Sequence, residues 1–287
     1  MPTLSIIIPC RNEAESLRTL LPEIKQHQPD AEVILVNDGS DDDSGLVAEQ
    51  AGVTVINRPY SMGNGAAIKT GARHASGDIL LFMDADGQHQ PKDIQRLLTE
   101  MEQGGYDMVV GARDAKSQAS IGRWAANGFY NKLSSWMVGH RIADLTSGFR
   151  AVVATKFKEF IYLLPNKFSY PSTITMAFFR AGYAVSYVPI FAPPRIGKSH
   201  IHPLKDGLRF LLIIFKIGTL YSPLKLFIPL SMSFFSLGIV YYSYTFLTQG
   251  RFTNMGALLF ISAILIFLIG LVSEQITQVL YSHKESE

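Results

Sequence analysis

The segment at residues 77–91, GDILLFMDADGQHQP, decides the fold of this chain. Its apolar run at residues 79–83 is short and continuous, which is typical of a strand buried on both faces of a parallel sheet. Pro91 then begins a helical pattern, because proline is tolerated at the first position of a helix. The segment therefore predicts a buried strand, a polar loop and a helix.

Three oxygen-bearing side chains alternate in that loop: Asp84, Asp86 and Gln88. Carboxylates crowded at the end of a buried strand repel one another unless a positive group offsets the repulsion. Mg²⁺ does so with one or two carboxylates, waters and substrate phosphates as its ligands. An acidic turn with solvated carboxylates is the alternative. The position directly after a buried strand favours a divalent metal site, for Mg²⁺ or Mn²⁺.

The bulk composition limits the class of protein. The chain has 287 residues, a hydrophobic content of 47% and a formal net charge of +2, which argues against a nucleic-acid-binding surface. Cys10 is the single cysteine, so there is no disulfide framework, and a small strand-end residue is a better interpretation of it than a nucleophile. The N-terminal MPTLSIIIPCRNE lacks the basic region of a signal peptide. We therefore expect the N-terminal part on the cytosolic side.

Strand and helix patterns alternate through the N-terminal half. Strands are expected at residues 4–9, 32–37, 53–57, 79–83 and 108–112, and helices at residues 13–27, 44–51, 63–75 and 91–103. This alternation predicts an α/β fold, a Rossmann-like and mostly parallel sheet with helices on both faces. Ligands bind beyond the carboxyl ends of such strands. Asp38, Asp84 and Arg113 each follow a predicted strand, so we expect them to face one crevice.

After Gly122 the pattern becomes mainly helical. A polar loop at residues 144–150 (DLTSGFR) interrupts it, and a helix at residues 172–181 and a late strand at residues 185–188 follow. Residues 193–202 (PPRIGKSHIH) form a basic, glycine-containing segment with few apolar anchors, which makes them a candidate lid.

The next segment, residues 204–221, is apolar except for a few charges. On a helical wheel Lys205, Arg209 and Lys216 fall within roughly 40° of one another. One basic stripe on an otherwise apolar helix suits a membrane surface with anionic headgroups. We therefore expect an amphipathic helix at the membrane boundary.

Two uncharged apolar stretches follow, residues 226–247 and 255–272, joined by a short turn. Each is about as long as a helix that crosses the hydrocarbon of a bilayer. Buried core helices are the alternative, but two such stretches in succession favour a transmembrane hairpin. The basic residues that precede them place that flank in the cytosol. We expect Glu274 at the membrane boundary rather than as a functional intramembrane carboxylate.

Taken together, these motifs resemble the family 2 glycosyltransferases, and among them the dolichol-phosphate mannosyltransferase-like branch of polyprenyl-phosphate glycosyltransferases. The resemblance covers nearly the whole chain. The motifs that carry it are PCRNE at residues 9–13, VNDGS at 36–40, GNG at 63–65 with Gly71, DADGQ at 84–88, GAR at 111–113, Asp144 with SGFR at 147–150, and RIGKS at 195–199. Asn37 stands where such enzymes often have an acidic residue, which leaves the nucleotide base open.

The resemblance implies a GT-A fold that transfers one sugar, with inversion, from a GDP- or UDP-linked donor to a polyisoprenyl phosphate such as undecaprenyl or dolichyl phosphate. Site residues follow by position. Base and ribose would contact Pro9, Arg11, Asn12, Glu13 and Asp38; the metal on the donor diphosphate would bind Asp84, Asp86 and Gln88; the acceptor phosphate would meet Arg113 and Arg150; and Arg195 and Lys198 would close over the donor. Asp86, Arg113 and Arg150 are thus the expected catalytic residues.

Structural roles for some of these residues, and two other functions for the chain, stay open. The glycines at 63 and 65 are equally consistent with a simple loop-to-helix turn, and Arg150 with a structural ion-pairing residue. A polysaccharide synthase is a second candidate function, but its QxxRW motif is missing, since Gln118 stands at the wrong spacing from Arg123. A non-enzymatic membrane scaffold is the third.

The resemblance and the segment patterns together divide the chain into three parts. We expect a cytosolic glycosyltransferase domain at residues 1–202, a juxtamembrane helix at 203–222, and a membrane hairpin with a short cytosolic tail at 223–287. The expected partners are a nucleotide sugar, a polyprenyl phosphate, the membrane and a possible second copy of the chain. The membrane would be the plasma (inner) membrane, or that of the endoplasmic reticulum in a eukaryote.

Overall fold

The computed structural model describes residues 2–113, 121–167, 169–192, 215, 218–219 and 222–282. The chain divides into two compact units, one made of Met1–Ser135 and His140–Leu204, the other of Trp136–Gly139 and Lys205–Glu287. The predicted lid, with Arg195 and Lys198, and almost all of the predicted amphipathic helix lie outside the described residues.

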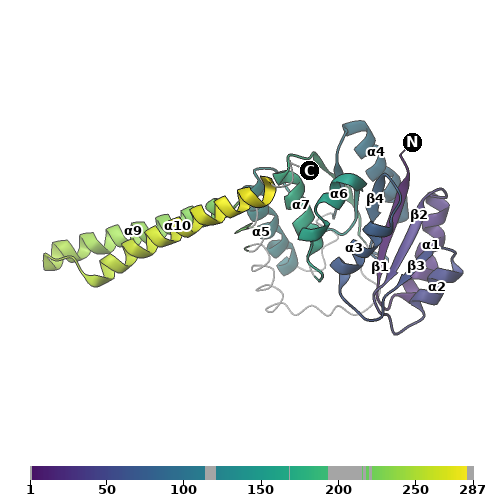
Figure 1. Cartoon of the computed structure of the whole chain (residues 1–287), viewed down its shortest axis with the longest axis horizontal. Coiled ribbons are helices and arrows are strands. Elements are labelled where there is room, and N and C mark those ends of the chain that lie inside the picture. Colours follow the sequence, from purple (N-terminus) through teal and green to yellow (C-terminus); the bar gives the residue numbers. More distant parts are fainter. Residues whose placement is uncertain are drawn as a thin grey trace. The chain divides into compact units, whose positions relative to one another are not determined.

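In the described part of the first unit, helices alternate with strands of one sheet (Figure 1). Its elements are β1 (Leu4–Cys10), α1 (Ala14–His27), β2 (Glu32–Asn37), α2 (Ser44–Gln50), β3 (Thr54–Asn57), α3 (Asn64–His74), β4 (Ile79–Phe82), η1 (Pro91–Asp93), α4 (Ile94–Gly104), β5 (Met108–Arg113), α5 (Ile121–Val138, whose end groups with the second unit), β6 (Arg150–Val153), α6 (Ala154–Glu159), η3 (Ile161–Leu163), α7 (Tyr170–Arg180) and β7 (Val185–Ile190).

The described strands form a seven-stranded sheet in the order β3-β2-β1-β4-β6-β5-β7. Every pairing is parallel except those of β6, which runs antiparallel to both β4 and β5. In β1, Ile6, Ile7 and Ile8 all have 0% exposure, as expected of a continuous apolar run that is covered on both faces. The predicted, mostly parallel α/β sheet is confirmed.

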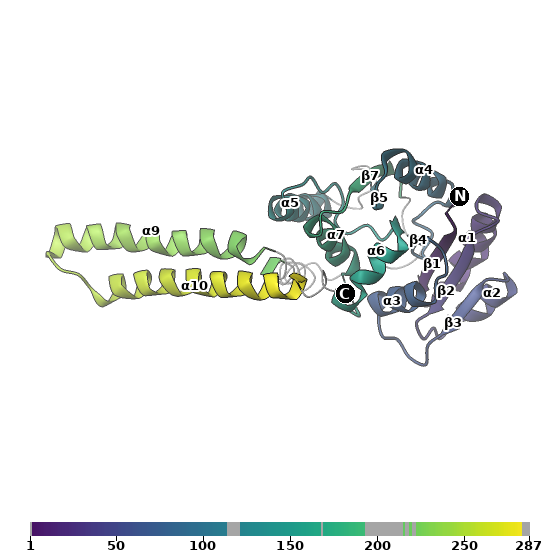
Figure 2. The same cartoon turned by 45° about the horizontal axis from the view of Figure 1, so that its top comes forward.

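Helices cover both faces of the sheet (Figure 2). On one face, α1, α2 and α4 pack against alternate strand residues such as Ile8 and Leu81. On the other face, α3 lies so close to β1 that a Cβ added at Gly71 would be 2.4 Å from Ile7 Cγ2. On that face the ring of Phe82 packs against the ring of Phe157 in α6, with 4.6 Å between the ring centroids. The two layers leave the carboxyl ends of β1, β2 and β4 facing a crevice.

Strand β6 corrects one expectation, because Arg150 begins a strand instead of closing a loop. Its four residues, RAVV, begin with a charge and run directly into α6, so no separate strand stands out in the sequence. Ala151 pairs with both Leu81 of β4 and Val109 of β5. The strand thus forms because it completes the backbone hydrogen bonds between two neighbours, which only the folded sheet reveals.

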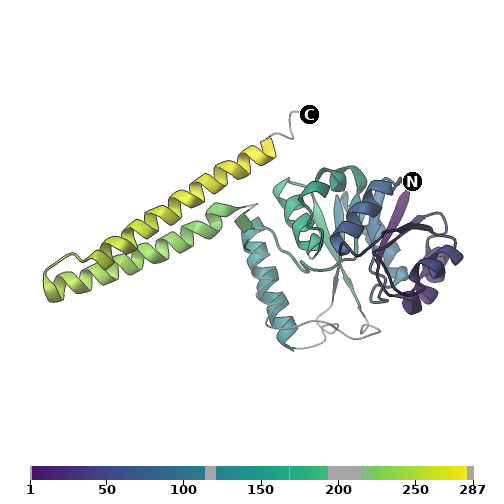
Figure 3. The same ribbon diagram turned by 60° about the horizontal axis from the view of Figure 1, so that its bottom comes forward.

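In the second unit, the described residues form two long helices, α9 (Pro223–Gln249) and α10 (Asn254–Ser282), which lie side by side (Figures 1 and 3). Gly238 packs against the ring of Phe260, and Ser231 Oγ donates to Ala263 O at 2.8 Å. Both helices are long and apolar enough to cross a membrane, and only 6% and 17% of their apolar windows are buried. Core helices would be mostly buried, so the predicted hairpin is the better description.

Candidate active site

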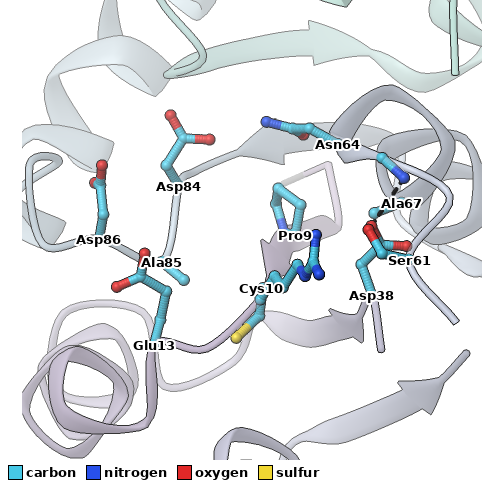
Figure 4. A pocket seen from close by; sticks show the side chains of 12 residues that line it. Pro9, Cys10, Glu13, Asp38, Ser61, Asn64, Ala67, Asp84, Ala85 and Asp86 are labelled. Carbon is cyan, nitrogen blue, oxygen red and sulfur yellow. Dashed lines mark hydrogen bonds between the residues drawn. The ribbon is translucent and has the colours of Figure 1, made fainter. Parts of the chain in front are cut away.

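A cavity of about 360 Å³ lies at the carboxyl ends of β1, β2 and β4 (Figure 4). Six of its lining residues belong to the predicted site: Pro9, Arg11, Glu13, Asp38, Asp84 and Asp86. Cys10, Ser61, Gly63, Asn64, Ala67 and Ala85 complete the lining. Burial raises the pKa of Cys10 to about 11, so its thiol is protonated at neutral pH. This agrees with its interpretation as a strand-end residue and not a nucleophile.

Asp84 and Asp86 project their carboxylates to the same side, whereas the Ala85 side chain points away from them (Figure 4). Ala85 is buried at 3% exposure, which anchors the segment between them. Gly87 adopts a φ of +74°, a conformation that favours glycine, and lets the chain turn so that the N–H of Gln88 donates to Asp86 Oδ1 at 3.1 Å. The loop thus presents carboxylate oxygens to the cavity, the ligand type that hard divalent cations prefer.

Few side chains at the cavity can act as metal ligands. Among the described residues, no three His, Cys, Asp or Glu side chains come together as a metal-binding group. Two carboxylates in an open cavity leave room for phosphate oxygens and waters, which is how proteins commonly hold Mg²⁺. The residues present therefore fit a metal that shares its ligands with a phosphate substrate, and they do not fit a closed structural site.

His89, which was not predicted as a site residue, supports the acidic loop at residues 84–88 from the protein interior. Its ring is buried at 5% exposure and stacks on Phe149, with 5.1 Å between ring centroids. Burial lowers the pKa of His89 to about 4, so the imidazole is neutral at pH 7. Its Nδ1 accepts a hydrogen bond from the backbone N–H of Asp84 at 3.0 Å. The end of β4 is therefore fixed at the residue that carries the first carboxylate.

Asp38 lines the cavity, but the protein itself occupies its carboxylate. It accepts hydrogen bonds from Ser61 Oγ and from the backbone N–H groups of Met62 and Gly63, at 2.8 to 2.9 Å. Arg58 Nη1 lies 2.9 Å from Oδ1 as an ion pair. Burial alone would raise the pKa of Asp38, but these hydrogen bonds and the Arg58 charge outweigh it and lower the pKa. The carboxylate holds the 58–63 loop in place, a function that the sequence did not reveal.

The loop after β1 is held by the loop after β2. Asn12, whose φ of +56° is unusual for a residue other than glycine, accepts a hydrogen bond from the N–H of Asp41 at 2.8 Å. At the start of α1, Ser44 Oγ accepts from Glu13 N and Asp42 Oδ2 accepts from Ala14 N. The acidic run thus caps α1 as well as preceding α2. Asn12 shapes the loop and does not line the cavity.

The contacts at the start of α3 favour the structural interpretation of Gly63 and Gly65, a simple loop-to-helix turn. Gly65 N donates to Lys167 O, and Ala66 N donates to Asn166 O at 2.7 Å. A Cβ on Gly65 would lie 2.0 Å from Pro165 O, so only glycine fits there. Because carbonyl groups already occupy these N–H groups, this end of α3 is a packed loop-to-helix junction. Gly63 and Asn64 still line the cavity beside it.

Arg113, at the end of β5, is held by Asp144. Arg113 Nε and Nη2 donate to the two carboxylate oxygens at 2.8 and 3.0 Å, and Nη2 also donates to Thr146 Oγ1. Burial opposes the charge on both groups, but the pairing outweighs it, so the pKa of Arg113 is raised and that of Asp144 is lowered. The Arg113 side chain keeps 29% exposure. It is therefore a fixed cation that still reaches solvent.

Arg150, by contrast, is enclosed, with 0% exposure. Its Nη1 donates to Pro171 O and Thr175 Oγ1, at 3.1 and 3.0 Å, and its Nη2 donates to Ser147 O. A side chain without exposed surface does not reach a ligand in the crevice unless the protein rearranges. This geometry disfavours the expected contact with an acceptor phosphate and agrees with the structural alternative, although through backbone carbonyls and not through an ion pair.

Comparison with known proteins places the chain in a family. Its residues 5–161 match Glycosyl transferase family 2, and residues 222–279 match the GtrB C-terminal hairpin. The undecaprenyl-phosphate mannosyltransferase of Micrococcus luteus is 31% identical over 212 residues, 67% of this chain and 85% of that protein. The undecaprenyl-phosphate 4-deoxy-4-formamido-L-arabinose transferase of Proteus mirabilis is 36% identical over 160 residues, and the chain spans about half of its length (48%).

Solved structures share the fold. The glucosyl-3-phosphoglycerate synthase of Mycobacterium tuberculosis, in complex with phosphoglyceric acid, matches with a TM-score of 0.62 at 17% identity, over 76% of this chain and 80% of that protein. The same enzyme with Mn²⁺, UDP and glucosyl-3-phosphoglycerate matches with a TM-score of 0.59 at 20% identity, over 74% and 80%. The GT-A fold and the family expected from the motifs are confirmed. The chain belongs to glycosyl transferase family 2 and carries a C-terminal hairpin of the GtrB type.

Proposed function

We propose that this protein transfers one sugar from a nucleoside diphosphate sugar to a polyprenyl phosphate at the cytosolic face of a membrane, with inversion at the anomeric carbon. The observation that supports this most is the cavity itself. It combines Pro9, Arg11, Glu13 and Asp38 with the paired carboxylates Asp84 and Asp86, in a chain whose relatives are named as undecaprenyl-phosphate sugar transferases.

The donor would lie in this cavity with its base and ribose toward the loops after β1 and β2. Arg11 and Glu13 offer side chains there, and Asp38 acts indirectly, because it holds the loop that carries Ser61 and Gly63. Asn37 uses both ends of its amide within the protein, as its Oδ1 accepts from Ser40 N and its Nδ2 donates to Asn57. These contacts leave GDP and UDP donors as equal candidates.

Asp84, Asp86 and Gln88 would hold a divalent metal, Mg²⁺ or Mn²⁺, together with the donor diphosphate. Such an ion neutralises the negative charge that develops on the departing nucleoside diphosphate. The role of the protein is to keep the two carboxylates on one side of the loop, which the buried Ala85 and the turn at Gly87 achieve. The solved GT-A relative with Mn²⁺ and UDP is consistent with this assignment.

The acceptor phosphate would meet Arg113. A phosphate monoester has a second pKa near 6 and is mostly ionised at pH 7, so it needs no strong general base. It needs cations that let it approach a second anion, and a guanidinium suits this because it stays charged and carries several N–H donors. Arg113 is already oriented by Asp144, so little conformational freedom is lost when the acceptor binds. Arg195 and Lys198 remain candidates for a closing segment over the donor.

The hairpin would keep the enzyme at the membrane that holds its lipid acceptor. Helices α9 and α10 are exposed along apolar faces, with Met232 at 63% and Val240 at 68% exposure, as expected of side chains that contact lipid. The plasma membrane of a bacterium, with residues 1–202 in the cytosol, is the proposed location. A homo-oligomer would be compatible with this arrangement.

The test uses the full-length protein in undecaprenyl-phosphate-containing vesicles, with labelled nucleotide sugars supplied one at a time and Mg²⁺ or Mn²⁺ present. Wild-type protein should transfer label from one donor to the lipid. Asp86→Asn should reduce transfer by at least about 100-fold, because the variant loses a charged ligand, yet it should remain folded and membrane-inserted. Glu102→Gln, which changes an exposed carboxylate of α4, is the matched control and should keep wild-type turnover.

Two results would contradict the proposal. Transfer that proceeds at full rate with all divalent ions chelated would remove the metal assignment. Failure to label the lipid with every nucleotide sugar, by protein that is folded and inserted, would remove the proposed reaction.

A further inference from the structure

Arg150 has an unusual environment for a buried cation. Among the described residues no carboxylate forms an ion pair with it, and all oxygen acceptors of its guanidinium are uncharged: Ser147 O, Pro171 O and Thr175 Oγ1. Its Nε is buried without a hydrogen-bond partner. Burying a charge in this way is costly, so the side chain must provide something that a neutral one would not.

The guanidinium of Arg150 binds the backbone of the segment that precedes it. Arg150 Nη2 donates to the carbonyl of Ser147, and Tyr170 OH donates to the next carbonyl, that of Gly148, at 3.1 Å. The Arg150 guanidinium lies 5.7 Å from the centre of the Tyr170 ring, so the two side chains act side by side. Ser147 Oγ in turn donates to Gly111 O at 2.6 Å. Two successive carbonyl groups are thus held from one side of the segment.

The other side of the segment at residues 147–148 faces the side chain of Asp84. A Cβ added at Gly148 would be 2.7 Å from Asp84 Oδ2 and 3.2 Å from its Oδ1. The backbone at Gly148 is therefore in contact with the carboxylate at the end of β4. The N–H of Asp84 is meanwhile held by His89. His89 thus fixes the backbone of Asp84, and the backbone of Gly148 packs against the Asp84 carboxylate.

We propose that Arg150 and Tyr170 are positioning residues, which hold the carbonyls of Ser147 and Gly148 so that this segment fixes the Asp84 carboxylate for a divalent cation. The inference rests on the proposed function, in which Asp84 is a metal ligand. It assigns Arg150 a role in metal binding through the backbone, in place of contact with the acceptor.

The experiment measures Mn²⁺ affinity directly, from the electron paramagnetic resonance signal of free Mn²⁺ titrated with full-length protein in detergent and no substrate. Arg150→Met keeps the volume and removes the donors, and Tyr170→Phe removes only the hydroxyl that holds Gly148. Changes in groups that orient metal ligands typically cost 10- to 100-fold in affinity. We expect the Mn²⁺ dissociation constant to rise about 10-fold in Arg150→Met and about 3-fold in Tyr170→Phe, with Arg150→Lys in between.

The matched control is Tyr183→Phe, which also removes a phenol that donates a hydrogen bond, in this case to Glu159. It should leave Mn²⁺ affinity unchanged, and thermal melts of every variant identify the temperatures at which each is folded. Unchanged affinity in folded Tyr170→Phe and Arg150→Lys overturns the inference, because a merely structural role changes melting and not metal binding. If Arg150→Met does not fold, the other two variants decide. Wild-type protein that binds no Mn²⁺ overturns the proposed metal site itself, and this inference with it.

Discussion

Asp38 illustrates at the scale of a residue how a side chain can line a ligand cavity and still be occupied by its own protein. Its position after β2 was predicted from the sequence, because the strand and the turn that follows it have clear patterns. Its partners were not, since Arg58, Ser61 and Met62 come from a loop whose path depends on the folded sheet. Position along a strand is a local property, whereas hydrogen-bond partners are set by tertiary structure.

Asp38→Asn should therefore destabilise the protein more than it alters donor contacts. The variant leaves Arg58 buried without its anion, which typically costs about 3 kcal/mol of unfolding free energy. Because the pKa of Asp38 is lowered in the folded state, its contribution is present above the unfolded pKa of about 4 and is lost as pH falls through the folded value.

Thermal melts of wild type and Asp38→Asn between pH 3 and 8 measure this difference. We expect a constant gap at neutral pH that narrows below about pH 4. A gap that stays constant down to pH 3 would show that the ionised carboxylate contributes nothing to stability. Asp43→Asn, which changes an exposed carboxylate directly before α2, is the control and should melt with the wild type at neutral pH.

At the scale of elements, segments with clear ends were predicted well, and segments that follow one another without a turn signal were not. The ranges expected for the first five strands agree with the structure to within a residue, because each is an apolar run with clear ends. The elements β6 and α6 were missed, since α6 begins directly after β6 with no turn residue between them, so neither has a clear end in the sequence. Arg150 was assigned to the acceptor phosphate by its position in the SGFR motif, and a motif position does not reveal that the side chain is enclosed.

Gly71 gives a test of how closely α3 packs on the sheet. A Cβ there would be 2.4 Å from Ile7 Cγ2, so Gly71→Ala should lower the unfolding free energy by about 1–3 kcal/mol through overpacking. Gly128→Ala is the matched control, because Gly128 lies in α5 with nothing within 4 Å of its Cβ position. It should stabilise the protein by about 0.5–1 kcal/mol, as alanine does in helices. Denaturant unfolding compares the two, and equal effects would refute the close packing.

At the scale of the whole molecule, the second unit has the dimensions of a membrane hairpin. From Lys225 to Tyr244, helix α9 rises about 28 Å, close to the roughly 30 Å of bilayer hydrocarbon. Lys225 Nζ donates to Met137 O at 2.8 Å at one end, and Tyr244 is 61% exposed near the other. A cation at one boundary and a tyrosine at the other are typical anchors of a spanning helix. The turn after α9, which carries Arg251, should then lie beyond the far boundary.

The chain offers a clean way to test this topology, because Cys10 is its single cysteine and is buried. In intact cells a membrane-impermeant maleimide should label Arg251→Cys in the turn and leave Glu102→Cys unlabelled, since Glu102 is exposed on the proposed cytosolic domain. Wild-type protein is the control for Cys10, and both variants should react once the cells are opened. Labelling of Arg251→Cys only after opening would mean that the hairpin does not cross the membrane, and labelling of Glu102→Cys in intact cells would invert the orientation. The second result would separate the enzyme from the cytosolic nucleotide sugars that its cavity is proposed to bind, whereas the first would remove only the spanning hairpin.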